Sequence, residues 1–148
     1  MSDSDARQEL LQRPSLEDET RRVTAARDEI RDALSAQLGL TRWTDQDRPG
    51  EAGCGEDLDL PGTTGSTSTL LLADGVPDDQ WAAAVQVVTD VAARHGFGAP
   101  QIVIDRPGQH DAEWPGERES RIVFGTVTNA TLRLEYGCHL PAAARGGP

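Results

Sequence analysis

The chain has 148 residues, the usual size of a single domain with one hydrophobic core. Its formal net charge is −11, and all 14 of its basic residues are Arg. Binding to phosphates requires clustered Lys and Arg, so this charge argues against nucleic acid and against an anionic membrane surface as partners. The sequence has no run of 18 apolar residues and a polar beginning, so we expect neither a transmembrane segment nor a signal peptide within it.

The first part of the chain predicts a tether followed by a long helix. Residues 1–14 are polar and mixed in charge and end at Pro14, so we expect them to be flexible. Ser15 is a typical helix cap, and apolar residues recur at helical spacing over residues 16–38. Gly39 is the residue expected just after the end of such a helix.

The middle of the chain alternates between irregular and regular sequence. A short β-like run at 40–44 is followed by residues 45–65, whose Gly, Asp and Pro content predicts irregular structure. β-branched residues and leucines at 66–72 predict a strand. Pro77 and the acids after it are typical of a helix start, and the spacing of apolar residues predicts a second helix over 78–95.

The last part of the chain predicts three strands. The first is a short strand at 101–105, and the polar residues 106–119 after it are interpreted as a long loop. Apolar residues then alternate at 122–126 and 132–136, which predicts two strands with one buried face. Asn129 tolerates the positive φ of a tight turn, so a hairpin is favoured between them.

This order of elements predicts a single α+β domain over residues 15–141. We expect two layers, with an antiparallel-dominated sheet of four or five strands and both helices on one face. A right-handed crossover through the second helix would also allow a mixed sheet. The small and Gly-rich residues 142–148 predict a disordered tail.

The two cysteines are interpreted as a disulfide. Cys54 and Cys138 are 84 positions apart, and each lies beside a glycine that lets the backbone approach closely. They lack the spacing of a zinc or redox motif. Buried free thiols are the alternative interpretation.

The segment 106–119, together with Asp105 just before it, is the best place to seek a polar site, since loops carry function more often than cores do. The candidate residues for a polar site or partner surface are Asp105, Arg106, His110, Asp111 and Trp114. The alternatives are an ordinary surface loop and a Trp114 side chain that folds back onto the sheet.

Other constellations are weaker. Asp45, Asp47 and Glu56 match three positions of a calcium-binding EF-hand loop, but Pro49 stands at a fourth and no second helix can follow, so we expect no metal. The sequence has no nucleophile elbow, phosphate loop or dinucleotide fingerprint, so we also expect no cofactor and no catalytic residue.

Four sets of residues carry a resemblance to a known family. They are the run Phe124–Pro141 (FGTVTNATLRLEYGCHLP), Ala52-Gly53-Cys54, Gly96-Phe97-Gly98 with Pro100, and Arg106-Pro107-Gly108 with His110. The chain resembles the LppA-like lipoproteins of mycobacteria and related high-GC bacteria, from the first long helix to Pro141. The resemblance implies an extracytoplasmic domain whose start at Met1 follows a removed signal and a lipidated cysteine.

The resulting expectation is a non-enzymatic binding domain of a cell-envelope lipoprotein, with an unknown protein or envelope component as partner. An intracellular acidic inhibitor or immunity-type protein is the alternative, because residues 45–80 hold nine acidic residues against one Arg. A small enzyme with its site on the 106–119 segment is the third possibility.

Overall fold

The computed structural model describes residues 3–54 and 62–144. Its elements in chain order are α1 (Asp3–Gln12), α2 (Leu16–Leu38), β1 (Trp43–Asp45), β2 (Gly50–Gly53), β3 (Thr63–Ser66), β4 (Leu70–Leu72), α3 (Asp78–Arg94), β5 (Gln101–Arg106), β6 (Gln109–Pro115), η1 (Glu117–Glu119), β7 (Arg121–Thr126), β8 (Ala130–His139) and η2 (Ala142–Ala144).

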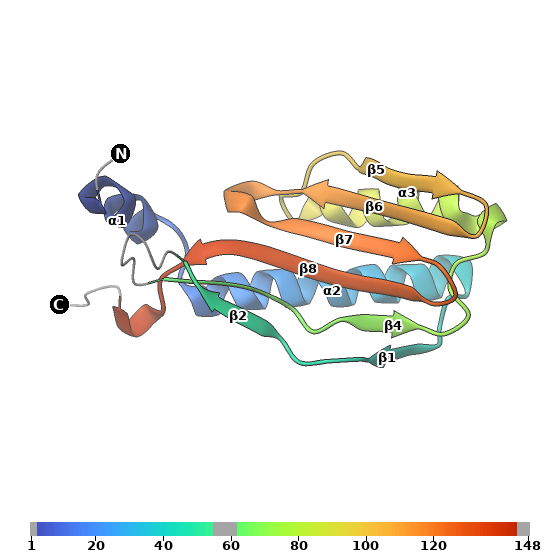
Figure 1. Cartoon of the computed structure of the whole chain (residues 1–148), viewed down its shortest axis with the longest axis horizontal. Coiled ribbons are helices and arrows are strands. Elements are labelled where there is room, and N and C mark those ends of the chain that lie inside the picture. Colours follow the sequence, from blue (N-terminus) through green and yellow to red (C-terminus); the bar gives the residue numbers. More distant parts are fainter. Residues whose placement is uncertain (1–2, 55–61, 145–148) are drawn as a thin grey trace.

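The strands form one antiparallel sheet covered on one face by α2 and α3 (Figure 1). The main strand order is β1-β4-β8-β7-β6-β5, and β3 pairs with β8 while β2 pairs with β3. The expected α+β class, two layers and antiparallel pairing are confirmed. The expected count of four or five strands is wrong, because the sheet has eight.

The caps of α2 explain where this helix begins and ends. The Ser15 hydroxyl accepts a hydrogen bond from the Asp18 backbone N–H at 3.1 Å. Gly39 adopts a φ of +71°, which a residue with a side chain rarely adopts, and its N–H bonds the last carbonyls of the helix. The expected bounds of this helix are therefore confirmed.

The core lies between the two long helices and the sheet. Every second residue of β8 from Ala130 to Tyr136 is buried, and the same alternation holds in β7. These side chains pack against the apolar stripes of α2 and α3, including Ile30 and Val88, which are fully buried. The hairpin expected from the alternating apolar residues is present as β7 and β8.

Two segments that were expected to lack regular structure contain strands. Residues 45–65 include β2 and most of β3, which ends at Ser66, and the polar segment 106–119 contains β6. The strand expected over 66–72 is shorter, because β4 is formed by Leu70–Leu72 alone. The interpretation of 106–119 as a long loop was wrong because β6 exposes polar residues on one face only. Its alternate residues His110, Ala112 and Trp114 are buried against the helices.

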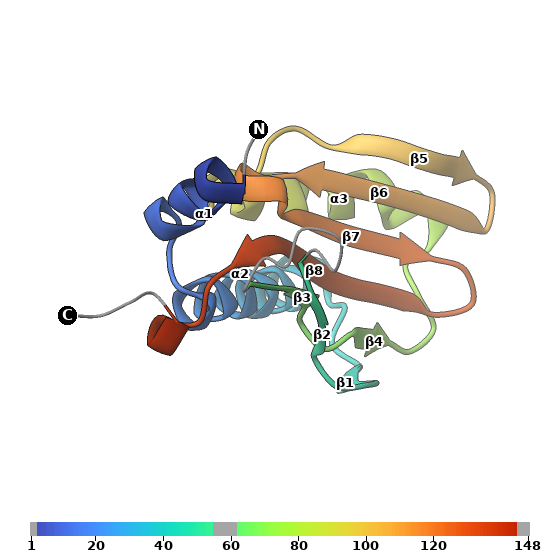
Figure 2. The same cartoon turned by 60° about the vertical axis from the view of Figure 1, so that its left-hand side comes forward.

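The N-terminal segment that was expected to be a tether contains α1, and the tail segment contains η2. Leu10 of α1 is buried, and Arg13 donates a hydrogen bond from Nη1 to the Cys138 carbonyl at 2.9 Å. Both elements lie at the end of the molecule where β8 finishes (Figure 2). The division of the chain into tether, domain and tail stays a prediction.

An irregularity in β8 changes which side chains face the helices. Tyr136 pairs with Gly65 and His139 pairs with Thr63, so β8 uses one more residue than β3 over this stretch. This bulge reverses the alternation of the strand. As a result His139 as well as Tyr136 is buried, while Cys138 between them bonds Cys54.

Candidate functional site

The sheet separates the five residues that were predicted to form a polar site. On β6, His110 and Trp114 face the helices and Asp111 faces the uncovered side, which we call the open face. Asp105 on β5 joins His110, whereas Arg106 is exposed. Trp114 is fully buried and donates from Nε1 to the Thr89 hydroxyl at 3.0 Å, so it folds back onto the sheet and is not an exposed anchor.

His110 bridges two carboxylates from different elements. Its Nδ1 lies 2.9 Å from Asp105 Oδ1 and its Nε2 lies 2.7 Å from Asp78 Oδ1. Burial acts to lower the pKa of His110, but the hydrogen bonds to Asp78 and Asp105 outweigh it and raise the pKa above its ordinary value of 6.5. Asp78 also accepts a hydrogen bond from the Gly108 backbone N–H, and this bond and His110 lower the pKa of Asp78.

This bridge has a structural role and does not leave His110 free to act as a base. Both ring nitrogens of His110 are bonded to carboxylates, and the ring stacks on Trp81 with centroids 5.0 Å apart. Neither nitrogen is directed at solvent as a base. The bridge therefore fixes the β5–β6 turn against the first turn of α3.

Asp111 lies in a groove on the open face. The groove has a volume of about 260 Å³ and lies near the tips of the β5–β6 and β7–β8 hairpins. Ile104, Val123, Gly125, Val127 and Thr131 are among its lining residues. Burial, and then the charge of Glu113, raise the pKa of Asp111 above its ordinary value of 3.8.

Two arginines and two glutamates of the open face pair with one another. Arg121 lies 3.1 Å from Glu113 and 2.6 Å from Glu135, and Arg133 lies 2.7 Å from the second oxygen of Glu135. Among the described residues no basic side chain lies within ion-pair distance of Asp111. Asp111 therefore presents a half-buried carboxylate that has room for a cation.

A second hollow lies on the other part of the open face, near the disulfide. It has a volume of about 500 Å³, and we call it the β2–β3 hollow. Its lining includes Glu51, Thr64, Glu119, Arg133 and Glu135. Arg133 and Glu135 already pair with each other there, so this hollow presents a mixed and internally paired surface.

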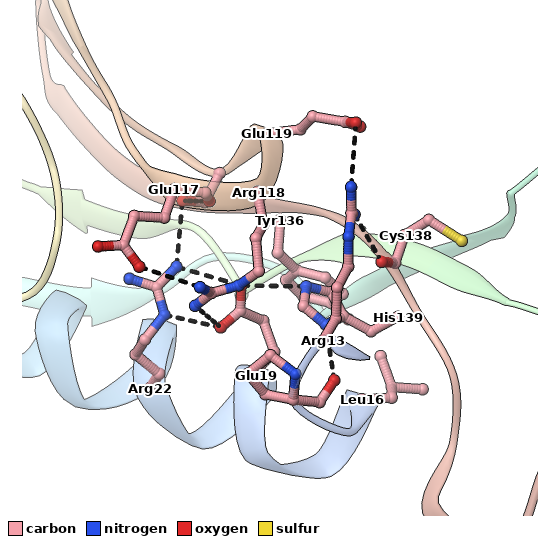
Figure 3. Close-up of polar contacts among 12 residues, drawn as sticks. Arg13, Leu16, Glu19, Arg22, Glu117, Arg118, Glu119, Tyr136, Cys138 and His139 are labelled. Atoms are coloured by element: carbon pink, nitrogen blue, oxygen red, sulfur yellow. Dashed lines mark hydrogen bonds and ion pairs between the residues drawn. The ribbon is translucent and has the colours of Figure 1, made fainter. Parts of the chain in front are cut away.

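A buried ionic cluster joins α2 to the end of β8. Figure 3 shows Arg22, Arg118 and His139 around the carboxylate of Glu19. The nitrogen to oxygen distances are 2.7 Å from Arg22 Nε, 3.7 Å from Arg118 Nη2 and 3.1 Å from His139 Nε2. Burial acts to raise the pKa of Glu19, but the contacts with His139 and Arg22 outweigh it and lower the pKa to about 2.

Sequence reasoning missed this cluster because its members come from three distant segments. Glu19 follows the helix cap, where an acid is expected for the helix dipole alone. Arg118 lies in the β6–β7 turn with a φ of +54°, which only the structure reveals. The one available signal was His139 beside Cys138, for which a structural role near the disulfide is now visible.

The disulfide between Cys54 and Cys138 is present, with Cα atoms 5.6 Å apart. It joins the residue after β2 to the bulged part of β8. Arg13 bonds the carbonyl of the same Cys138 (Figure 3), so the segment before α2 contacts β8 beside the disulfide.

The residues of the weak calcium motif have other partners. Asp47 accepts hydrogen bonds from the Thr69 N–H and hydroxyl, and Asp45 accepts one from the Ser68 hydroxyl. Glu56 lies outside the described residues. Within residues 3–54 and 62–144 no group of three or more His, Cys, Asp or Glu is placed to hold a metal ion.

In the same two stretches of chain, no helix has both the length and the apolar character needed to cross a membrane. The 23 residues of α2 make it the longest described helix, but they include charged residues throughout.

Comparison with known proteins gives one family and two solved structures. Residues 3–142 match the family LppA, described as a lipoprotein confined to pathogenic Mycobacterium. A crystal structure of LppA from Mycobacterium tuberculosis is similar, with a TM-score of 0.81 and 18% sequence identity over 97% of this chain and 89% of that chain. A DUF4853 family protein from Actinomyces odontolyticus has a TM-score of 0.65 and 18% identity over 93% of this chain and 73% of that chain. No curated protein matches the sequence.

Proposed function

Because the chain belongs to the LppA lipoprotein family, we propose that it is the extracytoplasmic domain of a lipid-anchored cell-envelope protein and that it binds a protein or another envelope component. The disulfide carries this proposal. Structural disulfides persist in oxidising compartments and are rare in a reducing cytosol. The Cys54–Cys138 bond ties a segment with few core residues to the longest strand of the sheet.

The arrangement of the elements supports an anchor on the N-terminal side. In Figure 1, α1 and the end of β8 lie at one end of the molecule, and the tips of the β5–β6 and β7–β8 hairpins lie at the opposite end. A lipid attached upstream of residue 1 would hold the α1 end close to the membrane. The Asp111 groove would then face away from the membrane, where a partner can reach it.

Binding is favoured over catalysis because most of the candidate reactive groups already have bonding partners. Both cysteines are oxidised to the disulfide, and both nitrogens of His110 are bonded to carboxylates. On the open face Arg121 and Arg133 pair with Glu113 and Glu135, whereas Asp111 has no ion pair within the described part of the chain. A groove with one available carboxylate beside apolar side chains is typical of a recognition surface.

The experiment is expression of the complete reading frame, including whatever precedes residue 1, in the natural host. We expect the protein in the membrane fraction and in the detergent phase after Triton X-114 partition. Replacing the lipid-attachment cysteine by alanine should move it to the aqueous phase, whereas Cys54→Ser should leave it in the detergent phase. A reading frame that starts at Met1, with protein only in the aqueous phase and with reduced thiols, would contradict the proposal and favour the intracellular acidic inhibitor.

A further inference from the structure

We propose that the outer edge of β5 and the adjoining Asp111 groove bind an extended basic segment of a partner protein. The segment would add to β5 as a further strand and place a Lys or Arg side chain against the Asp111 carboxylate. This inference rests on the proposed binding function and names the class of partner.

The first observation is the unpaired edge of β5. β5 pairs with β6 on one side and ends the main strand order, so no described strand lies on its other side. An edge strand presents a row of backbone donors and acceptors to which an extended peptide can add. β5 has six residues between Pro100 and Pro107, whereas β1 at the opposite edge has three. The prolines limit pairing at β5 to a short segment.

The second observation is where apolar side chains are exposed. Among the described residues the exposed large hydrophobic side chains are Ile102, Val103 and Val127, which are 51%, 55% and 65% exposed. Two of them lie on β5, and Val127 lines the Asp111 groove together with Ile104 of β5. Ile102 pairs with Ala112 and so lies on the helix side of the β5 edge, whereas Ile104 and Val127 lie at the groove. Exposed apolar side chains at one edge and groove mark an interaction surface more strongly than scattered ones do.

The third observation is the charge of the groove. Asp111 has no ion-pair partner within the described part of the chain, and Glu113 lies on the same face two residues away. Burial and Glu113 raise the pKa of Asp111, while the Ala112 N–H and the charge of Arg121 act in the opposite direction. A cation placed against the carboxylate would favour its charged form. A net charge of −11 adds long-range attraction for a basic segment.

The register connects the edge to the groove. Ile104 pairs with Asp111, so both side chains lie on the open face in neighbouring strands. A residue added opposite Ile104 would lie two strand spacings, roughly 10 Å, from the β6 backbone. The long stems of Lys and Arg, extended across Ile104 toward the Asp111 side chain, can span this separation.

A second copy of this chain is the other candidate for the β5 edge. Two chains would each bring a net charge of −11 to the contact, which opposes self-association. The basic partner segment is therefore the occupant that the charges favour.

The test uses a fluorescent octapeptide in which lysine alternates with valine, and an acidic counterpart in which glutamate replaces lysine. Fluorescence anisotropy at physiological salt should show saturable binding of the basic peptide alone. Asp111→Asn should weaken binding about tenfold, and Ile102→Lys should weaken it at least as much by placing a like charge on the edge. Asp90→Asn removes the same charge from the exposed face of α3 and should leave the affinity within twofold.

Amide chemical shifts of the ¹⁵N-labelled protein locate the peptide. The expected result is perturbation centred on residues 101–106 and 109–113, with slowed amide exchange in β5. Perturbation centred on the β2–β3 hollow, equal weakening by Asp111→Asn and Asp90→Asn, equal binding of the acidic peptide, or sedimentation of the free protein as a dimer through β5 would each overturn the inference. None of these outcomes changes the membrane partition of the full-length protein, so this inference and the proposed envelope location fail separately.

Discussion

The Glu19 carboxylate and the His139 imidazole meet in the core, with Glu19 Oε2 3.1 Å from His139 Nε2 and neither side chain exposed to solvent. His139 Nδ1 also lies 2.9 Å from the Pro14 carbonyl oxygen, so both ring nitrogens face acceptors. This contact joins α2, the segment before it and the bulged end of β8. Arg22 completes the arrangement from one helical turn along α2.

Replacing Glu19 by alanine should destabilise the domain by about 3 to 5 kcal/mol, because it leaves the buried His139 and the partly buried Arg22 and Arg118 without the carboxylate that they contact. Urea unfolding followed by circular dichroism measures this change. Asp32→Ala on the same helix removes an exposed partner of Arg31 and should cost less than about 1 kcal/mol. A loss of less than about 1 kcal/mol for Glu19→Ala would show that the cluster does not stabilise the fold.

Acid should destabilise the domain through Glu19. The pKa of this carboxyl falls from its ordinary 4.5 to about 2 on folding, so its contribution is fully present above pH 4.5 and is lost as the pH falls toward 2. The shift corresponds to about 3 kcal/mol. Unfolding curves between pH 2 and pH 6 should therefore change less steeply in Glu19→Gln than in wild type. Parallel pH profiles for the two proteins would contradict this assignment.

Alkaline pH should weaken the contact between the β5–β6 turn and α3. The pKa of His110 is raised above 6.5 by Asp78 and Asp105 against the effect of burial, so the stability that it contributes is present below pH 6.5 and is lost as the pH rises through the raised value. We expect a lower Tm at pH 8.5 than at pH 6. His110→Gln should have a smaller difference between the two pH values, and an unchanged difference would argue against the bridge.

Reduction of the disulfide should destabilise the protein. Closing a loop between positions 84 apart contributes about 4 to 5 kcal/mol in the chain-entropy account. Cys54→Ser should lower the Tm, and reductant should lower the Tm of wild type by a similar amount. The same reductant should leave Cys54→Ser unmoved. A reductant effect on the variant would indicate that the change in wild type has another cause.

Truncation should lower the stability of the fold at Trp114 and weaken peptide binding at Val127. Trp114→Ala removes a fully buried side chain bonded to Thr89 and should cost about 3 to 5 kcal/mol of stability. Val127→Ala removes an exposed side chain and should change stability by less than about 0.5 kcal/mol while weakening binding of the basic peptide. Thermal unfolding and anisotropy on the same two variants measure both effects.

Local sequence patterns were sufficient to predict those elements whose bounds depend on neighbouring residues. The cap at Ser15, the end at Gly39 and the alternation in β7 and β8 are properties of neighbouring residues, so each could be predicted without the fold. The pairing of Cys54 with Cys138 also followed, because the chain offers only two cysteines.

The strands that were missed lack strong local preferences. β6 contains His, Asp, Ala and Glu between its ends, and its strand structure depends on pairing with β5 and β7 on either side. β2 and β3 are short and contain glycine, and β3 is held by its pairing with β8.

The candidate site was only partly predictable for the same reason. His110 and Asp111 are adjacent in sequence, yet a strand sends neighbouring side chains to opposite faces. Once β6 is known to be a strand, Asp111 falls on the open face and His110 in the core. Asp78 could not be assigned to His110 beforehand, because the two are 32 positions apart and meet only through the packing of α3 on the sheet.

The most direct test of the envelope assignment is the thiol state of the full-length protein inside its natural host. Cells are quenched with acid to stop thiol exchange, and their protein is then alkylated in denaturing buffer near neutral pH without reductant. The intact mass of the purified protein is then measured. The disulfide and the proposed location predict that neither Cys54 nor Cys138 is alkylated until reductant is added. Two alkylated thiols in the unreduced sample would contradict both the bond and the extracytoplasmic location that rests on it.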